Sequence, residues 1–310
     1  MLDDLKALSD YEMLSDVTEI IGTSAGSGFS LCYALGYNYY EIYEILANAD
    51  FEEFLDNDIG ICEDIIRVLT QYGWNKGDKL REYYENLIAR KGYNKDLTFK
   101  ELYEQRKIKL IITGTNLSKH KTEYFCLDSK FANTRIVDAI RISMSLPFIF
   151  TAVRTSEDEI FVDGGVLENF PVRYWDDVSK PTEFNHNTLG FILNTPEETK
   201  FKNNPNHTCE INSIQDFVAQ LMNTVLMSNE RQAHYPDHIC DAREVAIETS
   251  NISSTDFFLT DEQMTFLIFS GYVSTVEFLK KYNYIKEISE ENQYDINKMK
   301  LFIQEYNEKP

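Results

Sequence analysis

One pentapeptide, Gly22-Thr23-Ser24-Ala25-Gly26, constrains the fold of this chain more than any other segment. The apolar run over 17–21 before it is typical of a short buried strand, and residues 25–35 after it carry apolar side chains at helical spacing. Glycines on both sides of the serine permit a sharp turn between these elements, where larger residues would be crowded. The sequence therefore predicts a strand, a tight turn and a helix in direct succession.

Such a turn holds its serine in a position suited to nucleophilic chemistry. The hydroxyl of Ser24 would project into a cleft instead of lying along the helix. The helix start adds a positive dipole and unpaired N–H groups, among them that of Ala25, which favour a developing oxyanion. The alternative is a glycine-rich helix start in which Ser24 is only the N-cap, because turns of this kind are common without catalysis.

Composition narrows the class of protein. A length of 310 residues allows one large domain or two ordinary ones, and a net charge of −21 argues against a nucleic-acid partner. The same charge offers no electrostatic attraction to anionic membranes, so any lipid contact would depend on apolar side chains. The acidic N-terminus does not resemble a signal peptide, and no apolar run approaches the ~20 residues that span a bilayer. Five scattered cysteines without a disulfide pattern indicate a reducing, cytoplasmic setting.

Strand-like and helix-like segments alternate along the chain. This alternation predicts an α/β fold with a mostly parallel central sheet. The segment 195–210 is the best candidate for a loop, and Asn38 and Thr260 each begin a capping box. Helices are expected at 38–49, 60–72, 78–91, 134–144, 212–230 and 260–282, and further strands at 108–114, 122–127, 148–154, 159–163 and 188–194.

A serine nucleophile needs a base, and the histidines are poor candidates for that role. None of them has a clear carboxylate partner in the sequence, and Pro236 interrupts the helix that would place the last two on one face. No metal site is expected there for the same reason. The five are His120, His186, His207, His234 and His238.

A better candidate for the base is Asp163, in the run Asp163-Gly164-Gly165 at the end of a predicted strand. Asp-Gly is also an ordinary turn signal, which is the alternative interpretation. The two glycines allow close backbone approach, and the apolar strand would leave the carboxylate in a dry cleft. Desolvation there would raise the carboxyl pKa from about 3.9, and a hydrogen bond to Ser24 would orient proton transfer. The pair predicts a Ser–Asp dyad.

Together these segments resemble the patatin-like phospholipases, a family of lipid acyl hydrolases that use a Ser–Asp dyad. The similarity runs over about residues 1–282, leaving 283–310 as a charged helical tail. It implies a three-layer α/β hydrolase domain, catalytic Ser24 and Asp163, a lipid substrate, and no metal or organic cofactor. The matching segments are Gly22–Gly26, 33–37, 141–148, Asp163-Gly164-Gly165, Asn169-x-Pro171, 257–262 and Gly271-Tyr272.

The chain departs from the family pattern at its start. Family members begin with a strand and a loop of the form G-G-G-x-R/K-G, whose N–H groups form the oxyanion hole. Here Met1 falls in the helix expected after that loop, so only the Ala25 N–H is left as an expected donor. Losing one such donor costs about 3 kcal/mol of transition-state stabilisation. The first strand is therefore expected to be missing, through either truncation or natural variation.

Two other functions stay open at this point. A chain without the oxyanion loop is also compatible with a catalytically impaired scaffold that acts as an interaction protein. A Ser–His–Asp esterase is the third possibility, and it requires His234 or His238 to lie against Ser24. The lipid head group and acyl chain are not predicted, because the Phe, Tyr and Leu residues along 39–90 fit an acyl channel, a lid or plain core.

Overall fold

The computed structural model describes residues 2–11, 13–56, 61–177, 179–180, 183–194, 208–233, 241–252, 259–286, 288 and 290–308. Within it the chain divides into two units, each built from segments that are separate in sequence. The elbow unit comprises Val17–Pro171 and Glu210–Ala233. The terminal unit comprises Met1–Asp16, Val172–Cys209 and His234–Pro310. The predicted domain boundary near residue 282 stays a prediction.

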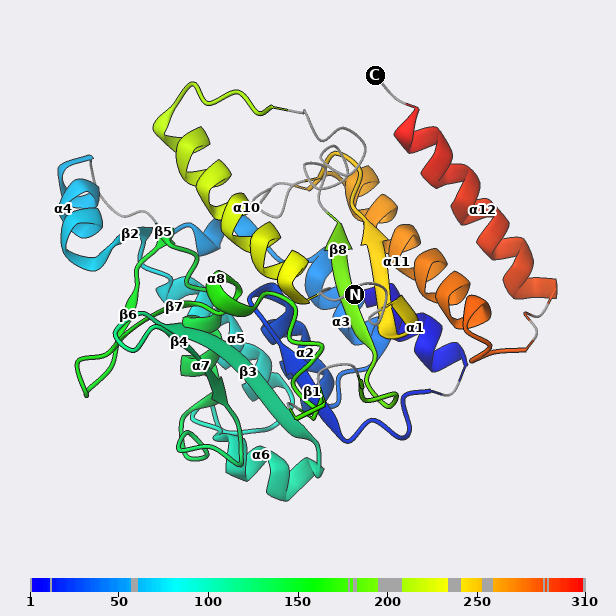
Figure 1. Ribbon diagram of the computed structural model, residues 1–310, viewed down its shortest axis with the longest axis horizontal. Helices are drawn as coiled ribbons and strands as arrows, with labels where there is room; N and C mark the ends of the chain where they lie inside the picture. The colour runs from blue at the N-terminus through cyan, green and yellow to red at the C-terminus, as the bar shows by residue number, and fades with distance from the viewer. Residues whose placement is uncertain are drawn as a thin grey trace. The chain divides into compact units, whose positions relative to one another are not determined.

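The elbow unit contains a five-stranded sheet and most of the helices (Figure 1). The strands of the elbow unit are β1 (Glu19–Gly22), β2 (Gly73–Asn75), β3 (Lys109–Asn116), β4 (Lys121–Phe125), β5 (Phe148–Phe150), β6 (Val153–Arg154) and β7 (Ile160–Asp163), and all but β2 and β5 belong to the five-stranded sheet. Its helices are α2 (Ala25–Leu35), α3 (Tyr39–Ala47), η1 (Phe51–Phe54), α4 (Ile61–Gln71), α5 (Asp78–Arg90), α6 (Phe99–Arg106), α7 (Ile136–Ser143), α8 (Gly165–Glu168) and α10 (Ile214–Ala233).

The buried strand β3 organises the sheet. β1 runs parallel to its first half, with Gly22 opposite Ile112, and β7 runs antiparallel to its second half, with Asp163 opposite Gly114. β4 pairs with β3 over Ile112–Asn116 and therefore occupies the other edge. β1 and β7 thus share one edge of β3, and their carboxyl ends point toward each other. This end-to-end arrangement brings the residues that follow β1 close to the end of β7.

The α/β class is confirmed, but the strand directions are mixed instead of mostly parallel. In the five-stranded sheet only β1 and β3 are parallel, whereas β4, β6 and β7 each pair antiparallel to a neighbour. A separate short pair, β2 with β5, is parallel. The expectation failed because β3 and β4 are joined by a tight turn, which reverses the chain, and because β6 and β7 are likewise neighbours along the chain.

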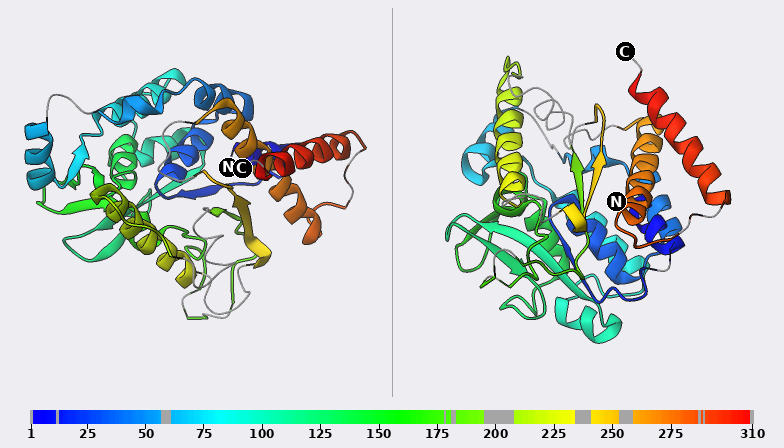
Figure 2. Two further views of the ribbon diagram at one scale, coloured as in Figure 1. Left: turned by 90° about the horizontal axis from the view of Figure 1, so that it is seen from above. Right: turned by 45° about the vertical axis from the view of Figure 1, so that its right-hand side comes forward.

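Helices cover both faces of this sheet (Figure 2). Successive residues of a strand face opposite sides, and Thr113 and Gly114 of β3 illustrate this. The hydroxyl of Thr113 lies on the face covered by α8, with α10 outside it, whereas Gly114 lies beneath Ile142 of α7. α2 and α5 pack beside α7 on that second face. The elbow unit is therefore a sheet between two helical layers.

The terminal unit contains α1 (Leu2–Asp10), β8 (Gly190–Asn194), η2 (Asp241–Arg243), β9 (Glu244–Glu248), α11 (Asp261–Lys281) and α12 (Glu290–Asn307). β8 and β9 pair in parallel, and α11 packs against α1, β9 and α12. A buried bidentate ion pair joins Arg243 to Asp176, at 2.6 and 2.7 Å, beneath the ring of Phe184.

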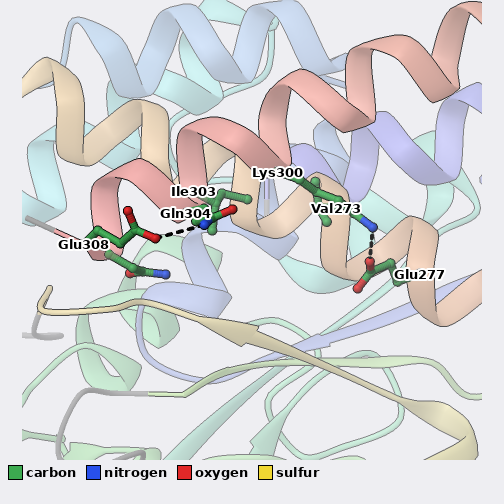
Figure 3. A pocket seen from close by; sticks show the side chains of 7 residues that line it. Val273, Glu277, Lys300, Ile303, Gln304 and Glu308 are labelled. Carbon is green, nitrogen blue, oxygen red and sulfur yellow. Dashed lines mark hydrogen bonds and ion pairs between the residues drawn. The ribbon is translucent and has the colours of Figure 1, made fainter.

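A groove in the terminal unit lies between α11 and α12 (Figure 3). Val273 and Ile303 form its apolar part, and an ion pair of 2.5 Å joins Lys300 to Glu277 across it. None of the side chains that line it is a serine, threonine, cysteine or histidine. The groove therefore offers no hydroxyl or thiol nucleophile.

Several predicted elements are confirmed and a few were missed. The capping boxes at Asn38 and Thr260 are both formed, and the helices that they begin are α3 and α11. Six of the described elements were not predicted, namely the helices η1, α6, α8 and η2 and the strands β2 and β9. β2 has three residues, too few for a period of two to be recognised in the sequence. Residues 195–207 of the predicted loop and 257–258 of the family-like segment lie outside the described residues.

Candidate active site

The turn between β1 and α2 holds Ser24 in a strained conformation. Its φ of 51° and ψ of −129° are unusual for a residue with a side chain. A Cβ atom at Gly22 would lie 2.3 Å from the carbonyl oxygen of Gly26, so the turn requires glycine at position 22. Ser24 occupies the N-cap position of α2, yet its side chain makes no capping hydrogen bond. The hydroxyl is therefore not used as a helix cap.

The Ser24 hydroxyl instead donates a hydrogen bond to a buried carboxylate. Ser24 Oγ lies 2.7 Å from Asp163 Oδ2, and the other carboxylate oxygen, Oδ1, accepts the N–H of Gly165 at 2.8 Å. The Asp163 side chain is almost completely buried, at 1% exposure. Burial raises the pKa of Asp163 to about 7, although the hydrogen bonds from Gly165 and Ser24 act in the opposite direction.

This electrostatic setting suits proton transfer near neutral pH. An aspartate with an ordinary pKa near 3.9 is a weak base, whereas one near 7 balances ionisation against basicity. The strained turn supplies a hydroxyl that donates to Asp163 Oδ2, so the hydrogen bond already directs the serine proton toward that oxygen. The arrangement can therefore generate a serine nucleophile.

A third segment, at the end of α7, supports both members of the pair. The N–H of Ser24 donates to Ser143 Oγ at 3.0 Å, and the N–H of Asp163 donates to the carbonyl of Ser145 at 2.9 Å. The N–H of Gly164 contacts the carbonyl of Ser143 at 3.4 Å. Residues 143–145 thus connect the serine turn to the end of β7 through backbone and hydroxyl contacts.

A buried arginine fixes this third segment. Arg141 Nη1 donates to Ser145 Oγ at 2.5 Å, and Nη2 donates to the carbonyl of Lys76 and to both oxygens of Thr151. Burial lowers the pKa of the Arg141 guanidinium to about 10. The five N–H donors of a guanidinium suit this multiple contact. Arg141 is therefore expected to hold 143–145 in place.

Two threonines join the serine turn to α8 on the other face of the sheet. Thr23 Oγ1 lies 2.7 Å from Thr113 Oγ1 and donates to the carbonyl of Glu168 at 3.2 Å. A Cβ atom at Gly164 would lie 2.1 Å from Thr113 Oγ1, which explains the glycine at that position. The sequence reasoning missed Thr113, and the available signal was a pair of threonines after the apolar run Leu110-Ile111-Ile112.

The backbone N–H of Ala25 is the oxyanion donor expected from the sequence. Ala25 is the first residue of α2, so its N–H has no carbonyl of a preceding turn of that helix to bond. The next two N–H groups, of Gly26 and Ser27, are already bonded to the carbonyls of Thr23 and Ser24 at 2.8 Å each. The role of Ala25 stays a prediction.

The histidines that the structure describes do not form part of this arrangement. His120 is exposed in the turn between β3 and β4, and His186, in the terminal unit, packs against Phe184 in a tilted arrangement with ring centroids 4.5 Å apart. His207, His234 and His238 lie outside the described residues. The carboxylate of Asp163 is the group that Ser24 contacts.

Comparison with known proteins identifies the family of this chain. The family model described as patatin-like phospholipase matches residues 4–176, more than half of the chain and a range that includes both Ser24 and Asp163. The chain belongs to the patatin-like phospholipase family. Its α/β fold, a sheet flanked by helices, is the fold expected of that membership.

Relatives of this family member occur in bacteria and viruses. It is 26% identical to the uncharacterized protein YqhO of Bacillus subtilis, over 88% of this chain and 93% of that protein. It is 25% identical to the probable lipid hydrolase 463L of invertebrate iridescent virus 6, over 51% of this chain and 53% of that one. The crystal structure of VipD from Legionella pneumophila shares the fold, with a TM-score of 0.57, 16% identity, and coverage of 98% of this chain and 71% of VipD.

Of the helices in the part of the chain that the structure describes, none combines the length and the apolar character needed to cross a bilayer.

Proposed function

We propose that this patatin-like phospholipase is a lipid acyl hydrolase that cleaves carboxylic esters, with Ser24 as nucleophile and Asp163 as base. The observation that carries the proposal is the 2.7 Å hydrogen bond from the strained Ser24 hydroxyl to the buried Asp163 carboxylate. The name of a viral relative, probable lipid hydrolase, supports a lipid ester as substrate. Buried free thiols at Cys32 and Cys126 support the proposed cytoplasmic setting.

The first half of the proposed reaction forms an acyl-enzyme. Ser24 Oγ attacks the ester carbonyl carbon while its proton moves to Asp163 Oδ2. The carbonyl oxygen becomes an oxyanion, which the Ala25 N–H and the positive end of α2 stabilise. The C–O bond to the alcohol then breaks, and Asp163 returns the proton to the leaving oxygen. The acyl group is left as an ester on Ser24.

The second half releases the fatty acid. A water molecule attacks the acyl carbon and transfers its proton to Asp163, and the resulting tetrahedral intermediate expels Ser24 Oγ. Asp163 then returns the proton to the serine, which restores the hydrogen bond seen in the structure. Ser24, Asp163 and water account for every proton, so the proposed reaction uses no metal or organic cofactor.

The proposal is tested with a pair of phospholipids that differ only in their linkage. A diester phosphatidylcholine presented in mixed micelles is expected to yield free fatty acid and lysophosphatidylcholine, which mass spectrometry detects. The dialkyl ether analogue has no acyl carbon and is expected to remain intact. The Ser24→Ala protein is expected to release nothing from either lipid. Release of phosphocholine, or fatty acid release that persists in Ser24→Ala, would contradict the proposal.

A further inference from the structure

α4 contacts β2, and β2 pairs with β5, at one edge of the elbow unit (Figure 1), and large apolar side chains on these elements are exposed there. We call this surface the α4–β2 patch. Its side chains are between 40% and 72% exposed, although all six are large and apolar or aromatic. They are Ile65, Ile66, Leu69, Tyr72, Trp74 and Phe148. Single exposed apolar residues are common on proteins, but six that gather on adjoining elements indicate an interaction surface.

The α4–β2 patch carries no net charge on a strongly acidic chain. Over residues 63–76 the charged side chains are Glu63, Asp64, Arg67 and Lys76, whose charges sum to zero. Asp64 and Arg67 pair at 2.9 Å and are only 11% and 8% exposed, whereas Glu63 is exposed on α4. At the rim of the patch, Arg154 is paired with Asp158 at 2.5 Å. The chain as a whole has a net charge of −21. A neutral, apolar area on such a surface matches a partner that is itself neutral and apolar, because the patch has no net charge to attract a charged partner.

The backbone holds one patch residue in a strained, exposed position. Phe148 has a φ of 67°, in the region that favours glycine, and its ring is 46% exposed. Its register partner in β2 is Gly73. The N–H groups of Ile149 and Phe150 both donate to the carbonyl of Leu146, which closes the turn before β5. A strained residue that is kept in place by such contacts points to a functional position.

The patch is connected to the candidate active site by a short stretch of chain. Phe148 follows Ser145 by three residues, so their Cα atoms are separated by at most about 11 Å. The carbonyl of Ser145 accepts the N–H of Asp163 at 2.9 Å. A surface in contact with Phe148 would therefore lie close to the proposed catalytic pair. A lipid substrate held in an aggregate has to be reached at such a surface.

We propose that the α4–β2 patch docks this protein on the surface of electrically neutral lipid aggregates. The inference rests on the proposed function, because it takes the substrate to be a lipid ester. Ile65, Ile66 and Leu69 would enter the acyl region, and Tyr72 and Trp74 would lie at the level of the head groups, where amphipathic aromatic side chains are favoured. Anionic head groups would repel the acidic chain, so zwitterionic lipid is the preferred surface.

Trp74 allows the docking to be measured directly. The chain has two tryptophans, and Trp175→Phe leaves Trp74 as the only one. In a Ser24→Ala, Trp175→Phe protein, phosphatidylcholine vesicles are expected to shift Trp74 emission to shorter wavelength. Adding Leu69→Glu is expected to weaken vesicle binding about tenfold or more. The transfer of the leucine side chain from water into the lipid would no longer stabilise the bound state.

Leu301→Glu provides the matched control. Leu301 is 60% exposed on α12, Leu69 is 72% exposed on α4, and both substitutions add one negative charge to a helix. Vesicle binding is expected to be unchanged by Leu301→Glu. The proposal is overturned if Trp74 emission does not respond to vesicles, or if the two variants bind equally well. It is also overturned if Leu69→Glu changes the sedimentation coefficient in the absence of lipid, since the patch would then be an interface between protein copies.

Failure of the docking and failure of the proposed function can be told apart. Vesicle binding is measured in a protein that lacks Ser24, so it does not depend on turnover. Vesicle binding by this protein, together with a wild type that hydrolyses no ester, would support the docking and contradict the proposed function. Hydrolysis of a dissolved short-chain ester by wild type, without any vesicle binding, would contradict the docking alone.

Discussion

Replacing Asp163 by Asn is expected to lower kcat/KM for ester hydrolysis by about 10³-fold or more while the protein stays folded. A general base contributes on the order of 10²–10⁴ to the rate, and the amide cannot accept the serine proton. The amide can still accept the Gly165 N–H and contact Ser24 Oγ, so the local geometry is expected to survive. Ser24→Ala removes the nucleophile itself and is expected to reduce hydrolysis to the uncatalysed level.

A buried serine in the terminal unit serves as the control for these variants. Ser270 is 5% exposed and its hydroxyl donates to the carbonyl of Glu248 at 2.7 Å. Ser270→Ala removes the same atom as Ser24→Ala and is expected to retain hydrolysis. Circular dichroism and urea unfolding check that each variant is folded. Substantial turnover by either folded dyad variant would eliminate the Ser–Asp mechanism.

The rate of ester hydrolysis is expected to depend on the ionisation of Asp163, whose pKa burial raises to about 7. The base must be ionised to act, so kcat/KM is expected to fall about tenfold for each pH unit below 7. Stability is expected to change in the opposite direction. The folded-state pKa lies above the unfolded value of about 3.9, so the folded protein binds the proton more tightly. The stabilisation from the protonated carboxyl is complete below pH 4 and is lost as the pH rises through 7.

This linkage makes Asp163→Asn a stabilising substitution at alkaline pH. The difference between the folded-state pKa of about 7 and the unfolded value of about 3.9 corresponds to about 4 kcal/mol in the free energy of unfolding. Wild type loses this stabilisation as the pH rises through 7. The Asn variant does not ionise and is expected to unfold at higher urea concentration than wild type at pH 8. The difference is expected to disappear as the pH approaches 4. Equal midpoints for the two proteins at pH 8 would show that burial of the ionised carboxylate does not destabilise the fold.

Sequence reasoning found the two halves of the candidate site because each is defined locally. Glycines around Ser24 and after Asp163 are required by backbone constraints that act within a few residues, so they can be recognised in the sequence. The contacts that join these halves are not local. Thr113 meets the serine turn because β1 pairs with β3, and Ser143 meets it because α7 packs against β3 and α2. Both arrangements depend on tertiary contacts.

The helix α4 illustrates the same limit for packing. Its apolar spacing predicted an amphipathic helix over 60–72, and a helix is present at Ile61–Gln71. The pattern could not indicate what would cover the apolar face, because burial depends on neighbouring elements. In the structure Ile65 and Leu69 remain exposed. This exposed face suggests a lipid contact, whereas the sequence alone left an acyl channel, a lid and plain core open.

The most direct test of the central claim is intact-mass analysis after incubation with a fluorophosphonate probe. This reagent phosphonylates a serine only when the hydroxyl is activated. Wild type is expected to gain one probe adduct per chain, at Ser24 by peptide mapping, and Ser24→Ala is expected to gain none. A folded wild-type protein that stays unlabelled would contradict the account and favour a scaffold without catalysis.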